Sequence, residues 1–127
     1  MRYECGFSFS YDQRELAQEV MLRLANSKWR VFMFDGEMQE GGYLWEWLQE
    51  KYLSCDRIAV FMNDRYLARP VTRREFQFFS ANSERWLDGR IQVFAKAQMG
   101  GTLLFSSGFP SRDLQSADEI AKVLLGT

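Results

Sequence analysis

Short apolar runs alternate with longer amphipathic segments along this chain, and this alternation constrains the fold more than any other feature. Three strand-like runs come first, at Cys5 to Ser10, Trp29 to Phe34 and Arg57 to Met62. The third is continuously apolar after its first residue, as strands covered on both faces tend to be. Strands that alternate with helices form parallel sheets, so we expect an α/β fold with an open, mainly parallel sheet of about five strands and helices on both faces.

Apolar side chains recur at helical spacing between and after these runs. The first helix is expected to begin at Asp12, because Asp12 and Glu15 resemble a reciprocal helix cap. Pro70 suits the first turn of a later helix, where its missing N–H group would be unpaired in any case. In chain order, the expected helices run to about Asn26, from Leu44 to about Ser54, from Pro70 through Phe79, and onward from a cap formed by Ser116 and Glu119.

Two further strand candidates, Arg90 to Ala97 and Thr102 to Ser106, do not both fit a parallel sheet. Only Gln98 to Gly101 separates them, whereas a parallel crossover needs a dozen or more residues. Either these two runs pair antiparallel, or one of them is not a strand.

The size and charge of the chain exclude several classes of protein. Its 127 residues fit one domain, residues 1–127, with a single core. Sixteen basic residues against 17 acidic ones give a formal net charge of -1, so no positive field would gather nucleic acid or anionic lipid. The sequence lacks a run of about 18 apolar residues and a signal-peptide pattern. We therefore expect a cytoplasmic protein without nucleic-acid or membrane partners.

The chain contains no histidine, which excludes histidine-based triads, histidine general bases and most zinc sites. Its two cysteines, Cys5 and Cys55, lack metal-ligand spacing and are too few for a disulfide framework. We expect no metal site, and any acid–base chemistry falls to carboxylates.

Polar residues follow the first and third strand-like runs. Ser10, Tyr11 and Asp12 end the first run, and Arg69 to Glu75 lies just beyond the third. In an open parallel sheet, strands one and three lie side by side where the strand order reverses, and ligands favour the crevice at their carboxyl ends. Glu75 is therefore expected to overlook a binding cleft. Ser10, Tyr11 and Asp12 either line this cleft or serve as a helix cap and as packing.

Five segments, taken together and in order, resemble the Toll/interleukin receptor (TIR) domain family. They are YECGFSFSY with Asp12, the strand from Trp29 to Asp35, the loop from Gly36 to Gly42, the strand from Ser54 to Met62, and Asn63 to Leu67. The resemblance implies a flavodoxin-like sheet, in agreement with the alternation of strands and helices. The segment from Gly36 to Gly42 looks like the BB loop of the family.

Many TIR domains cleave the nicotinamide glycosidic bond of NAD with a glutamate in a W-x-x-x-E pattern on the third helix. Here Val71 to Glu75 matches that pattern, with Val71 in place of the tryptophan. The resemblance implies an NAD hydrolase or cyclase with Glu75 as the catalytic carboxylate, NAD as the substrate and no further cofactor. The implied substrate-binding residues are Ser10, Tyr11, Asp12, Asp35, Trp45, Tyr66 and Val71.

TIR domains generally act after assembly, because the BB loop of one copy completes the site of the next. The resemblance therefore implies a homotypic TIR assembly or a clustering partner subunit. It also implies immune signalling as the setting, most consistently bacterial antiphage immunity.

A glutamate such as Glu75 suits the cleavage of an N-glycosidic bond on chemical grounds alone. Breaking an N-glycosidic bond develops positive charge on the ribose, which a fixed carboxylate stabilises. The nicotinamide ring of NAD is already cationic, so no general acid is required.

The alternative for Glu75 itself is a solvated helix carboxylate paired with a neighbouring arginine. Two alternatives remain for the whole domain. One is a non-catalytic TIR interaction module, which Val71 favours, and the other is a flavodoxin-like receiver or nucleotide-binding domain without TIR chemistry. The receiver would need a phosphate-binding glycine loop after the first strand, and Ser10 to Gln13 offers none.

Overall fold

The computed structural model describes residues 2–34, 42–95, 109, 111–113 and 116–126. At its centre lies a five-stranded sheet in the order β2-β1-β3-β4-β5, in which every neighbouring pair is parallel. The strands are β1 (Tyr3–Phe9), β2 (Val31–Met33), β3 (Cys55–Met62), β4 (Ile91–Ala95) and β5 (Ser111–Asp113). The helices are α1 (Arg14–Ala25), α2 (Gly42–Leu53), α3 (Asp64–Ala68), α4 (Pro70–Ala81) and α6 (Ala117–Leu125), with the 3-10 turns η1 (Tyr11–Gln13) and η2 (Ser83–Trp86).

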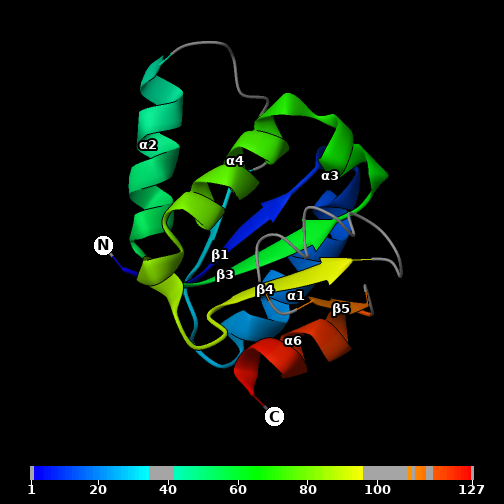
Figure 1. Cartoon of the computed structure of the whole chain (residues 1–127). Coiled ribbons are helices and arrows are strands. Elements are labelled where there is room, and N and C mark those ends of the chain that lie inside the picture. Colours follow the sequence, from blue (N-terminus) through cyan, green and yellow to red (C-terminus); the bar gives the residue numbers. More distant parts are fainter. Residues whose placement is uncertain (1, 35–41, 96–108, 110, 114–115, 127) are drawn as a thin grey trace.

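Helices cover both faces of the sheet, so the predicted α/β fold is confirmed. Figure 1 shows α2, α3 and α4 on one side of the sheet, and α1 and α6 on the other. Each layer encloses its own apolar cluster, and β3 contributes side chains to both. This double burial explains the continuously apolar sequence from Ile58 to Met62, all of which is buried or partly buried.

Strand β1 alternates large and small side chains, and the alternation decides what lies on each side of it. Cys5, Phe7 and Phe9 pack in the cluster beneath α1 and α6. Because successive side chains of a strand point to opposite faces, Gly6 and Ser8 face the layer of α2 and α4. Their small size leaves room above β1 for side chains from that layer.

The strand order reverses between β1 and β3. β1 pairs with β2 on one side and with β3 on the other, and Phe9 lies opposite Phe61 near the carboxyl ends. The sequence-based prediction that these two ends lie side by side is therefore confirmed. In open α/β sheets this is the position at which ligands bind.

The start of the first helix was predicted wrongly. The segment after β1 first forms η1, and α1 begins only at Arg14, with Gln13 as an N-cap that makes no side-chain capping bond. The predicted cap between Asp12 and Glu15 is therefore absent, because Asp12 bonds elsewhere, as described below. The predicted cap of the last helix is confirmed: the Glu119 N–H donates to Ser116 Oγ at 3.4 Å.

One α-helix and one strand of the described residues were not predicted from the sequence, in addition to the two 3-10 turns. The short helix α3 precedes Pro70, and β5 lies at Ser111–Asp113, pairing parallel with β4. The strand candidate Thr102 to Ser106 lies outside the described residues.

None of the described helices is both long and apolar enough to span a membrane. The described residues also form no group of three or more histidine, cysteine, aspartate or glutamate side chains that could hold a metal ion.

Candidate functional site

A polar network joins the carboxyl ends of β1 and β3. Ser10 Oγ donates to Asp12 Oδ1 at 2.5 Å, and Asn63 Nδ2 donates to Asp12 Oδ2 at 2.7 Å. Asn63 Oδ1 lies 3.2 Å from Ser10 Oγ and accepts the Tyr66 N–H at 2.9 Å, which caps α3. Partial burial opposes ionisation of Asp12, but the hydrogen bonds from Ser10 and Asn63 outweigh it and lower the pKa of Asp12 below its usual 3.8.

A second polar cluster lies deeper, where α4 packs over β1. Oε2 of Glu75 accepts a short hydrogen bond from the hydroxyl of Tyr52 on α2. Oε1 accepts a longer bond, 3.4 Å, from Ser8 Oγ on β1, and that serine oxygen lies 2.7 Å from the hydroxyl of Tyr66 on α3. All four side chains are buried. Side chains from α2, α4 and β1 therefore meet at one carboxyl group, and Tyr66 of α3 joins them through Ser8.

Burial dominates the ionisation of Glu75. Loss of solvent raises its pKa from 4.5 to about 7, although the hydrogen bonds from Tyr52 and Ser8 and the nearby charge of Arg69 act in the opposite direction. The pKa values of Tyr52 and Tyr66 lie well above 10, chiefly because both rings are buried. Near neutral pH, Glu75 therefore exchanges a proton while both tyrosine hydroxyls keep theirs.

The structure places the predicted site residues at three different depths. Glu75, expected to overlook an open cleft, is only 6% exposed, and Tyr66 lies beneath the surface with it. Val71 is partly buried, one helical turn before Glu75. Trp45 is also buried, where its ring contacts Phe78 and lies 4.5 Å from the guanidinium carbon of Arg74. Asp35 lies outside the described residues.

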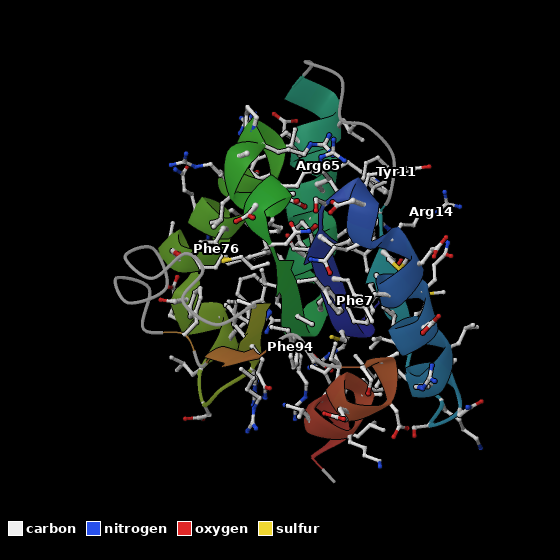
Figure 2. The ribbon with its side chains drawn as sticks, turned by 90° about the vertical axis from the view of Figure 1, so that its right-hand side faces the viewer. Phe7, Tyr11, Arg14, Arg65, Phe76 and Phe94 are labelled. Carbon is white, nitrogen blue, oxygen red and sulfur yellow. The ribbon has the colours of Figure 1, made fainter. Side chains whose placement is uncertain are left out.

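Tyr11 occupies the outermost level. It is 55% exposed and lines a cavity of about 320 Å³ together with Asp12, Arg14, Glu15 and Gln18. Arg14 Nη1 donates to the Tyr11 hydroxyl at 3.1 Å, and Figure 2 shows both side chains directed away from the sheet. Glu75 is not among the residues that line this cavity.

The family follows from a comparison over nearly the whole chain. A family model for the TIR domain matches residues 7–124. This chain belongs to the TIR domain family. The match runs from the last residues of β1 into α6 and includes both polar clusters. A comparison with curated proteins finds no match for this TIR domain.

Reasoning from the sequence missed three residues of the site in this TIR domain: Ser8, Tyr52 and Asn63. A signal existed for Ser8, because it alternates with phenylalanines in β1 and must face the layer opposite to them. Asn63 follows the last residue of β3 and is a favoured N-cap type. Tyr52 gave no signal beyond its apolar helical spacing, since a buried ring and a buried ring with a paired hydroxyl look alike in a sequence.

Proposed function

We propose that this TIR domain cleaves the N-glycosidic bond between nicotinamide and ribose in NAD, with Glu75 as the essential carboxylate. One observation carries the proposal. At the reversal point of the sheet, a single carboxyl group on α4 is buried, receives hydrogen bonds from Tyr52 and Ser8, and has a pKa of about 7. Perturbed carboxyl groups at such positions are candidates for function.

The chemistry needs little more than this carboxylate. As the bond from ribose C1′ to the nicotinamide nitrogen breaks, the electron pair leaves with the nicotinamide and the ribose ring becomes cationic. A fixed negative charge beside that ring lowers the barrier. Attack by water at C1′ gives ADP-ribose and releases one proton, whereas attack by a nitrogen of the adenine gives a cyclic product. The proposal covers both outcomes.

The burial of Glu75 supports a role for assembly. A carboxyl group that is 6% exposed reaches a ribose only after the side chains above it move, and contact with a second copy or a clustering partner would favour such a rearrangement. We therefore propose that activity requires a homotypic TIR assembly. Its setting would be immune, including antiphage, signalling.

A second candidate function is a non-catalytic interaction module that recruits other TIR domains. Two observations favour it: Val71 stands where active relatives commonly carry tryptophan, and Tyr52 and Ser8 already occupy the carboxyl oxygens of Glu75. In such a module, Glu75 would be a structural group that ties α4 to β1.

Release of nicotinamide from NAD tests the proposal directly. The protein is incubated with NAD over a wide range of protein concentrations, and nicotinamide is measured by chromatography. The expected result is a specific activity that increases with protein concentration and is absent from folded Glu75→Gln. Glu46→Gln is the matched control, because Glu46 is an exposed glutamate on α2. Wild-type turnover by folded Glu75→Gln would show that Glu75 is not the essential carboxylate. No turnover by the wild-type protein at any concentration favours the interaction module.

A further inference from the structure

The hydroxyl of Tyr52 lies between two acceptors. One is Oε2 of Glu75, and the other is the backbone carbonyl oxygen of Phe7 in β1, at 3.4 Å. Tyr52 is 1% exposed, so no bulk water competes for its hydroxyl. A phenol carries one proton and can donate it fully to only one acceptor at a time.

The charge on Glu75 decides between these acceptors. An ionised carboxyl group has no proton of its own and accepts from Tyr52, which is the stronger, charge-assisted bond. A protonated carboxyl group can instead donate to the Tyr52 oxygen, and this frees the tyrosine proton for the carbonyl of Phe7. We propose that Tyr52 is a proton-linked positioning residue whose hydroxyl moves between Glu75 and the Phe7 carbonyl as Glu75 gains or loses a proton.

The other groups around this pair do not replace Tyr52. Ser8 reaches Glu75 at 3.4 Å but shares its hydroxyl with Tyr66 at 2.7 Å. Arg69, at the start of α4, acts on Glu75 through its charge, and Cys55 near Tyr52 stays a neutral thiol because burial raises its pKa to about 12. Among these described groups, Glu75 is the one whose charge changes near neutral pH.

This arrangement gives Tyr52 a role distinct from packing. Its hydroxyl stabilises the ionised form of Glu75, so removing the hydroxyl while keeping the ring should raise the pKa of Glu75. A charge-assisted hydrogen bond is worth enough to shift a carboxyl pKa by roughly one to two units. The catalytic consequence rests on the proposed function. In a variant without the Tyr52 hydroxyl, the ascending limb of the pH–rate profile would shift to higher pH by the same amount. The titration itself does not depend on NAD cleavage.

Carbon-13 NMR of protein labelled at the glutamate side-chain carboxyl tests the proposal, with Glu75→Gln identifying the Glu75 signal. In Tyr52→Phe the midpoint of that signal should rise by about one unit or more. In Tyr66→Phe, which removes a hydroxyl that bonds to Ser8 and not to Glu75, the change should be smaller. An unchanged midpoint in folded Tyr52→Phe overturns the proposal, as does a larger shift in Tyr66→Phe.

A measurement on the wild-type protein keeps the proposal testable if Tyr52→Phe does not fold. The backbone carbonyl carbon of Phe7 should titrate with the same midpoint as Glu75, and this titration should vanish in Glu75→Gln. A Phe7 carbonyl signal that is constant from pH 5 to pH 9 while Glu75 titrates excludes the switch. If the NMR results hold but no nicotinamide is released, the proton switch stands and the proposed function fails.

Discussion

Tyr52 donates a hydrogen bond to Glu75, and this contact ties α2 to α4 directly above the small residues of β1. It is the shortest side-chain contact around the carboxyl group, since Ser8 lies at 3.4 Å. The bond does not compensate fully for the loss of solvent, because the pKa of Glu75 remains raised to about 7. The carboxyl group is therefore held in place in a setting that disfavours its charge.

The first prediction concerns stability against pH. The pKa of Glu75 is about 7 in the folded protein and near 4.5 when the chain unfolds, so the folded state binds the proton more tightly between these values. The free energy of unfolding should therefore fall as pH rises from about 4.5 to about 7, by on the order of 3 kcal/mol from this group alone. Glu75→Gln should lack this component.

Urea unfolding of both proteins at intervals between pH 4.5 and pH 8 measures the difference. Subtracting the two curves removes the contribution of the other carboxylates. The difference in unfolding free energy between the two proteins should therefore change with pH. If it stays constant across the range, or changes in the opposite direction, burial does not raise the pKa of Glu75.

The second prediction concerns the network at the carboxyl ends of β1 and β3. Asn63→Ala removes both the donor to Asp12 and the cap of α3. It should destabilise the protein by about 1 to 2 kcal/mol, as the loss of an N-cap and a charge-assisted bond typically does. It should also raise the pKa of Asp12, because one of the hydrogen bonds that lower it is gone.

Thermal unfolding and carboxyl NMR follow these two effects. Asn26→Ala is the control, since Asn26 is an exposed asparagine at the end of α1. If Asn63→Ala has the same melting temperature as Asn26→Ala and leaves the Asp12 titration unchanged, the network does not contribute to stability.

The order of the first four strands and of the four longer helices could be predicted because each of these elements carries its own apolar pattern. The apolar run from Ile58 to Met62 and the helical spacing around Leu48 need no knowledge of distant residues. β5 was missed because Ser111 to Asp113 has no apolar pattern, and its pairing with β4 depends on the rest of the sheet. The helix cap at Asp12 was wrong because Asn63, 51 residues away, binds the same carboxylate.

The candidate site was predicted from the topology of the sheet. Parallel strands place residues after β1 near residues after β3, and Ser10, Asp12 and the region of Glu75 were grouped on that ground. In the structure, Ser10 and Asp12 share one polar network, and Glu75 lies in a second, deeper cluster.

Positions 73 and 74 of α4 are exposed arginines, but Glu75 lies one turn before Phe79 on the helix face that is buried. This helical spacing was a signal for the burial of Glu75. Its hydroxyl partners Ser8 and Tyr52 lie on other elements, and no local pattern reports such pairings.

The third prediction concerns the close approach of β1 and β3. A Cβ atom on Gly6 would lie 2.7 Å from Sγ of the buried Cys55. Gly6→Ala should therefore destabilise the protein by about 1 to 3 kcal/mol through overpacking. Cys55→Ala removes the opposing sulfur, so the double variant should recover part of that loss.

A double-mutant cycle by urea unfolding checks this coupling. The expected interaction energy is favourable to the double variant by about 1 kcal/mol or more. Purely additive effects would mean that β1 moves away from Cys55 rather than pressing against it.

The last prediction concerns Val71, which lies one helical turn before Glu75 on the same side of α4. If NAD binds beside Glu75, a tryptophan at position 71 offers an aromatic surface to the nicotinamide or the adjoining ribose, worth on the order of 1 kcal/mol. Val71→Trp should therefore increase nicotinamide release several-fold.

Gln77→Trp is the control for Val71→Trp, because Gln77 is an exposed residue of the same helix. Melting temperature is measured beside turnover, since Val71 is partly buried and a larger ring can overpack. Unchanged melting with unchanged turnover would show that position 71 does not face the substrate.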